Sequence, residues 1–266
     1  MMTERMLDAL TKLEVGLIAI DEAHCISQWG PSFRPEYELL GTLRNYFPKT
    51  PIAALTATAD PATQADILDK LFNGNAGSIV LSFDRPNIKI AVKMKNNWKS
   101  QMLAFTKSRK GQSGIIYCLS RKKTEEAAAL LCKEGIPALP YHAGLPPEIR
   151  EQHQNIFMTE RGVVIVATIA FGMGIDKADV RYVFHTDLPS TLEAYYQEIG
   201  RAGRDGEPAE AQMLYGLRDI RMRRLFIDQE DCANDRKRRE HQKLDALLGF
   251  CEAPECRKRT LLDYFG

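Results

Sequence analysis

The chain has 266 residues, of which 44% are hydrophobic and 27% charged, and its formal net charge is +1. This composition excludes a disordered or low-complexity chain, and the length suits one large domain or two of ordinary size. No apolar run is long enough to span a bilayer, and the first twenty residues lack a signal-peptide pattern, so we expect a cytoplasmic protein with no membrane partner.

Short apolar runs recur along the chain, and longer stretches with helical character follow them. The runs are rich in β-branched residues and do not alternate with polar residues, which is typical of parallel strands covered on both faces. We predict strands at 15–20, 51–58, 78–83, 114–120, 162–168 and 181–187. In the stretch 121–135, Ala127, Leu130 and Leu131 share one helical face and Gly135 offers a stop. Strands that alternate with helices predict an α/β fold with a central parallel sheet.

Two changes in pattern divide the chain. The proline-containing segment 82–88 lies between two strand–helix groups, and we place a boundary at 83/84. Beyond Gly216 the chain predicts charged helices and no strand. That last region holds twelve basic and ten acidic residues, so it is not a basic tail.

A pair of adjacent carboxylates, Asp21 and Glu22, ends the apolar run IAI in the segment IAIDEAH (18–24). Side chains at the end of a parallel strand open into the crevice where nucleotides bind. Asp21 can hold Mg²⁺ through water, and Glu22 can orient or deprotonate an attacking water. A chance Asp-Glu pair at a strand end is the alternative, and it is a frequent one.

A second candidate site is the segment YYQEIGRAGRDG (195–206), in which Gln197, Arg201 and Arg204 surround two glycines. If this segment starts a helix that faces a cleft, Arg201 and Arg204 project onto one side. Two such guanidiniums can stabilise a transferring phosphoryl group, an effect worth roughly 10³–10⁵ in turnover. On this motif alone, an arginine pair at a surface turn is the preferred alternative.

The cysteines and the basic residues give weaker signals. The six cysteines contain no C-x-x-C pair, which favours reduced thiols over a disulfide framework. The stretch 84–123 holds eleven Lys or Arg and one acidic residue. Such a stretch can attract phosphates, but a solvated helix face explains it equally well.

In order along the chain, the motifs resemble those of superfamily two helicases: DEAH (21–24), ALTATA (54–59), ATIAFGMGID (167–176) and QEIGRAGRDG (197–206). The finer resemblance is to the RecQ family. It is carried by AHCISQWGPSFRPEY (23–37), FDRPNI (83–88), IIYCLSRKKTE (115–125), YHAGL (141–145) and CRKRTLLDYFG (256–266). Together these segments extend over nearly the whole chain.

The resemblance implies an ATP-dependent 3′→5′ DNA helicase of repair and recombination, which couples hydrolysis of Mg²⁺-ATP to movement on single-stranded DNA. Its DNA partners would be single strands and duplexes with a single-stranded tail. The implied architecture is a pair of tandem RecA-like lobes. The C-terminal part of the first lobe occupies 1–83, the second lobe 84–215, and the helical start of a zinc-binding region 216–266.

Carried over by motif position, the resemblance also implies roles for single residues. Asp21 would hold Mg²⁺, Glu22 would act on the water, His24 would link the γ-phosphate state to the second lobe, and Arg204 would be the arginine finger. The implied sets are Asp21, Glu22, His24, Gln197, Arg201 and Arg204 for the ATPase centre; Thr56 and Thr58 for coupling; Gly172, Gly174 and Asp176 for the loop near the nucleotide; and Trp29, Phe33, Arg34, Ser120, Arg121, His142 and Thr168 for DNA.

Some of these residues have structural alternatives. Trp29, beside Gly30, can be the buried anchor of a turn. His142 and His185 each follow or end a strand-like run, where a structural histidine with a satisfied hydrogen bond is commoner than a catalytic one.

The chain departs from the family pattern at both ends. A RecQ motor needs a phosphate-binding loop, G-x-x-x-x-G-K-[ST], but no Gly-Lys dipeptide occurs in these 266 residues. We therefore expect negligible ATPase activity from this chain alone. Cys256 matches the first of four zinc-binding cysteines, the other three are absent, and Cys251 is no evident substitute. Because structural zinc needs four ligands, we expect no stable zinc in this chain.

Two rival functions stay open at this point. A non-catalytic nucleic-acid-binding or regulatory protein gains from the missing loop, although the Asp-Glu and arginine motifs are intact. An RNA helicase of the same superfamily is disfavoured by the QWG segment and by the Cys256 segment.

Overall fold

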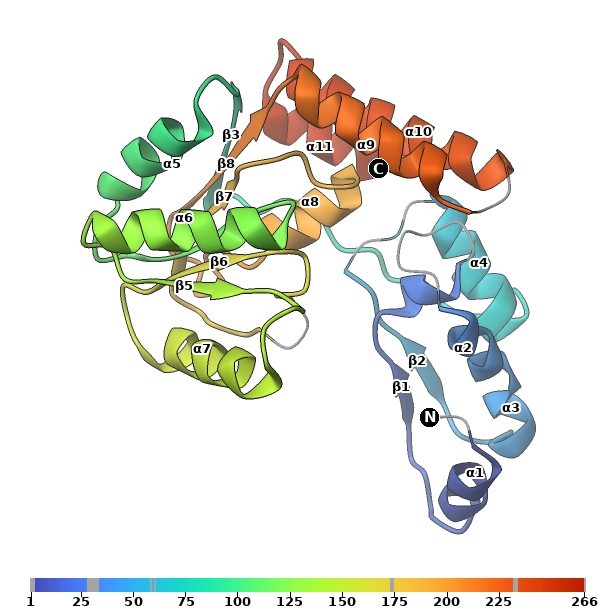
Figure 1. Ribbon diagram of the computed structural model, residues 1–266. Helices are drawn as coiled ribbons and strands as arrows, with labels where there is room; N and C mark the ends of the chain where they lie inside the picture. Colours follow the sequence, from blue (N-terminus) through green and yellow to red (C-terminus); the bar gives the residue numbers. More distant parts are fainter. Residues whose placement is uncertain are drawn as a thin grey trace. The chain divides into compact units, whose positions relative to one another are not determined.

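The structure is a computed structural model that describes residues 3–27, 34–57, 59, 61–172, 175–231 and 234–265 (Figure 1). The chain divides into two compact units, Met1–Phe83 with Leu262–Gly266 and Asp84–Leu261. Across the described ranges, no helix combines the length and the apolar character needed to cross a membrane.

The first unit is built on a short parallel pair of strands, β1 (Ile18–Ile20) and β2 (Ile52–Ala54). Its helices are α1 (Glu4–Thr11), the 3₁₀ turn η1 (Ala23–Ile26), α2 (Pro35–Glu38), the 3₁₀ turn η2 (Leu39–Thr42), α3 (Leu43–Tyr46) and α4 (Pro61–Phe72). Ile20, Ile26, Leu43 and Leu71 lie in its core. Burial of these apolar side chains holds the helices against the strand pair.

The strand predicted at 78–83 is wrong. This run has no regular secondary structure and belongs to no sheet, and Ile79, Val80 and Leu81 are 89%, 58% and 78% exposed. Its composition favours a strand, but a strand forms only where a neighbour satisfies its backbone hydrogen bonds. No described strand forms a sheet with it.

The second unit contains a six-stranded sheet of order β3-β8-β7-β4-β6-β5. Every pairing in it is parallel, as the apolar runs predict. The strands are β3 (Ile88–Met94), β4 (Ser113–Tyr117), β5 (Ala138–Tyr141), β6 (Val164–Ala167), β7 (Val180–His185) and β8 (Ala209–Tyr215). The predicted strands at 114–120, 162–168 and 181–187 are thus confirmed with shifted ends.

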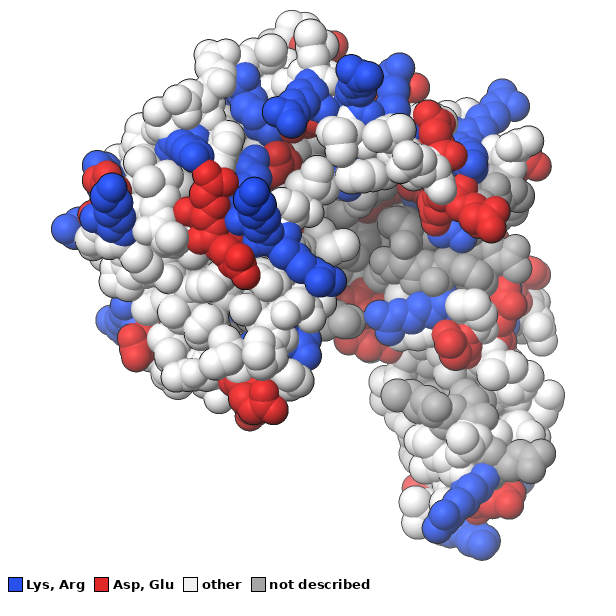
Figure 2. All heavy atoms as spheres, viewed as in Figure 1, with Lys and Arg blue, Asp and Glu red and all other residues white. Residues whose placement is uncertain are grey.

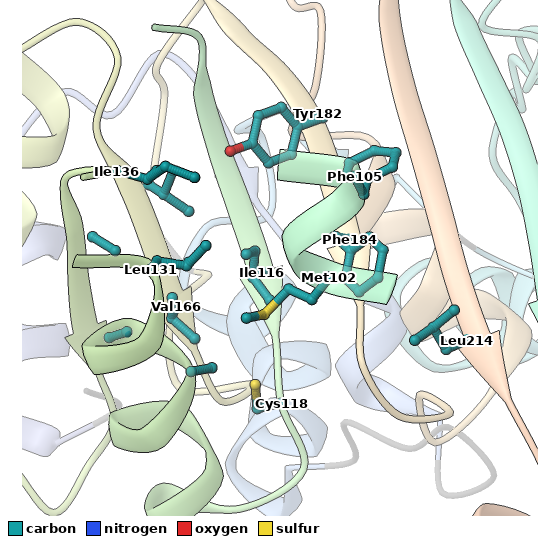
Figure 3. Packing of buried hydrophobic residues seen from close by; sticks show 14 residues of the cluster. Met102, Phe105, Ile116, Cys118, Leu131, Ile136, Val166, Tyr182, Phe184 and Leu214 are labelled. Atoms are coloured by element: carbon teal, nitrogen blue, oxygen red, sulfur yellow. The ribbon is translucent and has the colours of Figure 1, made fainter. Parts of the chain in front are cut away.

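Helices cover both faces of this sheet. On one face, α5 (Trp98–Lys107) and α6 (Arg121–Lys133) pack their apolar side chains against the strands, where Met102, Phe105 and Leu131 meet Ile116 and Phe184 (Figure 3). The other face carries α7 (Pro147–Thr159) and α8 (Leu192–Ile199). Gly135 ends α6 in the left-handed region, with φ +71°, as its position predicts.

Three helices follow the sheet, and no strand is described among them: α9 (Leu217–Gln229), α10 (Asn234–Glu252) and α11 (Arg257–Phe265). Helix α10 packs on α8, since the rings of Tyr195 and Phe250 lie 5.5 Å apart and Lys243 pairs with Glu193 at 3.2 Å. Lys and Arg side chains gather over the region of these three helices (Figure 2). The predicted change to charged helices beyond Gly216 is confirmed.

Candidate active site

The acidic pair lies directly after β1, at the carboxyl end of the strand. Asp21 Oδ1 accepts a hydrogen bond from the Glu22 backbone N–H at 2.8 Å, and its Oδ2 has no hydrogen-bond partner within the described residues. Glu22 has φ 50°, in the left-handed region that a residue with a side chain rarely adopts. Backbone strain of this kind is concentrated at functional sites. The strained Glu22 therefore favours a functional role for this turn over a chance Asp-Glu pair.

His24 joins the acidic pair to the ALTATA motif. Its Nδ1 lies 2.9 Å from Thr56 Oγ1 and 3.3 Å from Glu22 Oε2, and the imidazole is buried. Leu55, beside Thr56, donates its N–H to Ile20 O at 2.8 Å, because β2 continues alongside β1. The two motifs therefore share one hydrogen-bonded cluster in the first unit.

The described end of the QWG segment folds back toward this cluster. Arg34 donates its backbone N–H to Cys25 O at 3.0 Å, and its guanidinium lies 5.9 Å from the Tyr37 ring centroid. Tyr37 donates its hydroxyl to Asp21 O at 3.3 Å. Four residues of the predicted sites lie outside the described residues: Trp29, Phe33, Thr58 and Gly174.

In the second unit, Arg201 and Arg204 lie in the loop after α8, which we call the arginine loop (residues 200–207). The condition that this segment starts a helix is wrong, because α8 ends at Ile199 and Gly203 has φ +58°. The two side chains still reach one segment. Arg201 Nη1 donates to Gly172 O, and Arg204 Nη1 lies 2.7 Å from Asp176 Oδ1. The third predicted residue of this motif, Gln197, is half-buried on α8.

Burial of four rings fixes the end of α8. His185 stacks on Tyr117 at 5.2 Å and contacts Tyr195 at 5.1 Å, and Tyr195 in turn meets Phe250. Glu198 accepts from His185 Nε2 at 2.6 Å, and both side chains are buried. Burial raises the pKa of Tyr117, while the Arg201 guanidinium opposes that rise through its charge and a side-chain hydrogen bond. His185 is thus buried and hydrogen bonded through Nε2 to Glu198, which favours a structural role for it near the start of the arginine loop.

The residues predicted to contact DNA occupy different environments. Ser120 caps α6, accepting the Lys123 N–H at 3.3 Å, and Arg121 is exposed beside Gly144. His142 is only 2% exposed and lies 3.1 Å from Glu125, so its imidazole is not at the surface. Thr168 is half-buried at the end of β6.

Asp187, at the end of β7, is the centre of an ion-pair cluster that the sequence did not reveal. Its Oδ1 lies 2.9 Å from Lys95 Nζ and 2.7 Å from Lys123 Nζ, and its Oδ2 accepts the Leu119 N–H at 3.0 Å. Lys95 also pairs with Asp219 of α9 at 2.5 Å. The cluster fixes the turn that leads into Ser120 and Arg121. A single Asp after a strand carries no sequence signal for it.

Five of the eleven basic residues in the stretch 84–123 pair with carboxylates from elsewhere. Lys99 pairs with Glu126 and Lys107 with Glu134, in addition to the pairs of Lys95 and Lys123 with Asp187. Arg109 pairs with Glu210 at 2.6 Å. These pairs favour a structural explanation for much of the stretch and leave Arg121 as an exposed cation with motif support.

The donor atoms of the chain fit one of the two implied metals. Asp21 offers a carboxylate oxygen free of hydrogen bonds in the described residues, and such an oxygen suits Mg²⁺ held partly through water. Zinc does not fit, because Cys256 is exposed, Cys251 is buried, and the described residues contain no group of three His, Cys, Asp or Glu that could hold a metal.

Family models match three parts of the chain. The DEAD/DEAH box helicase model matches residues 1–67, the helicase conserved C-terminal domain residues 94–206, and the RecQ zinc-binding model residues 217–266. A protein named ATP-dependent DNA helicase RecQ from Haemophilus influenzae is 48% identical over all 266 residues. The chain belongs to the RecQ helicase family.

The relatives are much longer than this chain. The alignment with the Haemophilus influenzae RecQ helicase covers 100% of this chain but only 43% of that protein. A RecQ-like DNA helicase BLM from Xenopus laevis is 45% identical over 256 residues, which are 93% of this RecQ chain and 18% of that protein.

A solved structure supports the fold. Dbp5 of S. cerevisiae, bound to RNA and ADP BeF3, matches with a TM-score of 0.63 and 19% identity, covering 91% of this RecQ chain and 67% of that one. At this identity the likeness shows the fold alone, which is the RecA-like α/β arrangement of DEAD-box helicases followed here by helices.

Proposed function

We propose that this RecQ chain forms part of an ATP-dependent DNA helicase that moves 3′→5′ on single-stranded DNA and acts in repair and recombination. The observation that carries the proposal is that two helicase-like motifs of the second unit, QEIGRAGRDG (197–206) and ATIAFGMGID (167–176), are hydrogen bonded to each other. Arg201 and Arg204 bond to Gly172 and Asp176, so both guanidiniums are held at one segment.

Each of the proposed roles has local structural support. Asp21 would hold Mg²⁺, and the strained Glu22 beside it would orient or deprotonate the attacking water. His24 and Thr56, already hydrogen bonded, would couple the nucleotide state to motion. Arg204 would stabilise the transferring phosphoryl group after leaving Asp176, because an ion pair this exposed costs little to break.

The proposed DNA track of the second unit comprises Ser120, Arg121 and Thr168, with His142 below the surface. In the first unit, an aromatic ring of Trp29 or Phe33 would stack on a base, and Arg34 would pair with a phosphate. The proposed regions are 1–83 for the end of the first lobe, 84–215 for the second lobe and 216–266 for the start of the zinc-binding region.

The 266-residue chain by itself is proposed to hydrolyse ATP negligibly, because it holds no Gly-Lys phosphate loop. The rival function, a nucleic-acid-binding half-helicase without catalysis, is favoured by the same absence. Against it stand Asp21, Glu22, Arg201 and Arg204, which a purely structural remnant would not need.

The test begins by reading the encoding locus upstream of Met1 for an in-frame G-x-x-x-x-G-K-[ST] segment. The complete product is then assayed for ATP hydrolysis with matched DNA and RNA, and for unwinding of duplexes with a 3′ or a 5′ tail. We expect DNA-stimulated hydrolysis and unwinding of the 3′-tailed duplex.

Glu22→Gln should abolish hydrolysis and leave DNA binding intact. Hydrolysis by the purified 266-residue chain, a preference for RNA, or DNA binding without hydrolysis by the complete product would each contradict part of the proposal.

A further inference from the structure

The arginine loop accepts hydrogen bonds from two side chains that lie far from it in the sequence, Arg85 and Asn87. We call this set of hydrogen bonds the grip. Arg85 donates to three loop carbonyls, with Nη1 3.4 Å from Gly200 O and Nη2 3.0 Å from Ala202 O and 3.1 Å from Gly203 O. The first two of these carbonyls flank Arg201 in the chain. One guanidinium therefore holds the backbone on both sides of a proposed ATP-site arginine.

Asn87 grips the same loop further along. Its Nδ2 donates to Gly203 O at 2.8 Å and to Glu207 O at 3.0 Å, so it spans the turn that carries Arg204. A Cβ added to Gly203 would lie only 2.4 Å from that Nδ2, and Gly203 has φ +58°. The glycine thus allows both the left-handed turn and the close approach of Asn87.

The chemistry of the two side chains suits this grip. A guanidinium presents several N–H donors in a rigid planar fork, whereas a lysine is a single point charge on a flexible stem. An asparagine amide offers two donors, and an aspartate in the same shape offers none. Neither side chain can therefore be replaced by its usual conservative partner without loss of the grip.

We propose that Arg85 and Asn87 are positioning residues that hold the arginine loop so that Arg201 and Arg204 present their guanidiniums to the nucleotide. The proposal rests on the proposed function, because it assumes that these two arginines act on ATP. Both side chains would act through the loop backbone, because their hydrogen bonds go to its carbonyl groups.

The test measures directly how firmly the arginine loop is held, and it does not depend on ATP hydrolysis. Arg201 Nε is buried and has no hydrogen-bond partner within the described part of the chain, so its hydrogen exchanges with water only when the loop loosens. Arg109 Nε and Arg150 Nε are buried in the same way elsewhere in the second unit and serve as internal controls. The exchange of all three is measured by NMR on the full chain with ¹⁵N-labelled arginine, each signal being assigned by an Arg→Lys variant.

Asn87→Asp should accelerate the exchange of Arg201 at least about tenfold, since two hydrogen bonds are lost together. Arg109 and Arg150 should stay unchanged. The matched control is Asn97→Asp, because Asn97 caps α5 by accepting the Ser100 N–H at 3.2 Å, which an aspartate does equally well. Arg85→Lys is the second variant and should also release Arg201.

Unchanged Arg201 exchange in a folded Asn87→Asp or Arg85→Lys chain would overturn the proposal. Equal acceleration of all three arginines would overturn it too, because it would show a general loss of stability. If one variant fails to fold by circular dichroism, the other decides. In the complete protein the same variants should lower kcat more than they raise KM for ATP, and loose exchange without this kinetic effect would contradict the proposed function alone.

Discussion

Asp187 shows how much a single buried carboxylate contributes to the second unit. Burial opposes its charge, but Lys123 and Lys95 outweigh that effect and hold its pKa well below the usual range. Because the folded-state pKa is depressed, the carboxylate stabilises the fold above the unfolded value of about 3.9. That stabilisation is lost as the pH falls below 4 toward the folded-state pKa.

Asp187→Asn should therefore lower the free energy of unfolding at pH 7 by about 3 kcal/mol, because it leaves the largely buried Lys123 without its carboxylate partner and Lys95 with Asp219 alone. The difference from the unchanged chain should shrink below pH 4. Urea unfolding at pH 7, 5 and 3 measures it. Asp245→Asn, in an exposed pair with Arg224, is the control and should change stability by less than about 0.5 kcal/mol. A pH-independent difference for Asp187→Asn would contradict this account.

Gly114 in β4 has no room for a side chain. A Cβ there would lie 2.1 Å from two ring atoms of Tyr182, which is fully buried. Gly114→Ala should lower the free energy of unfolding by about 3 kcal/mol, because the ring and the strands must shift. Urea unfolding followed by circular dichroism checks this, and a loss below about 0.5 kcal/mol would show that the ring yields easily.

At the residue scale, the sequence predicted members of the site better than their surroundings. The motifs pointed to Asp21, Glu22, Arg201 and Arg204, because these residue types stand at characteristic spacings. They could not reveal Arg85 or Asn87. These two belong to the boundary segment and to the RecQ-like segment FDRPNI (83–88), neither of which indicated their contacts, and their partners lie more than a hundred residues away.

At the scale of elements, the sequence predicted three interior strands of the large sheet and missed the edge strands β3 and β5 and the interior strand β8. β4, β6 and β7 are continuous apolar runs because both of their faces are buried. β3 and β5 lie at the sheet edges, and β3 carries exposed lysines while β5 contains Pro140. The composition of 78–83 gave the opposite error. It predicted a strand, but no described strand lies beside this run to form a sheet with it.

Helix α10 offers an element-scale prediction. Gly249 lies exposed inside this helix, and a Cβ added there would meet nothing within 4 Å. Gly249→Ala should raise the free energy of unfolding of the second unit by about 0.5–1 kcal/mol, because alanine loses less backbone freedom in a helix. Thermal unfolding measures the effect, and a destabilised variant would show that the helix is not continuous at this point.

At the scale of the whole molecule, the two units differ in how much structure protects their backbone. Among the described residues, the first unit has two strands of three residues each, whereas the second has six strands covered on both faces. Amides of the β1–β2 pair, such as Leu55, should exchange with solvent on the order of a hundredfold faster than those of Ile115 or Val183. Hydrogen exchange followed by mass spectrometry checks this, and equal protection would mean that the units unfold together.

The pairing of β3 with β8 also governs how the protein is made. β3 is the first strand of its sheet in the chain, yet its neighbour is the last, with Ile88 opposite Ala209 and Met94 opposite Tyr215. At roughly 5–20 residues per second, the ribosome needs about 6–25 seconds to supply that partner. Until then β3 stays unpaired on the nascent chain, and the grip of Arg85 and Asn87 on the arginine loop cannot form. Arg85 and Asn87 can therefore contact the arginine loop only after most of the second unit has been synthesised.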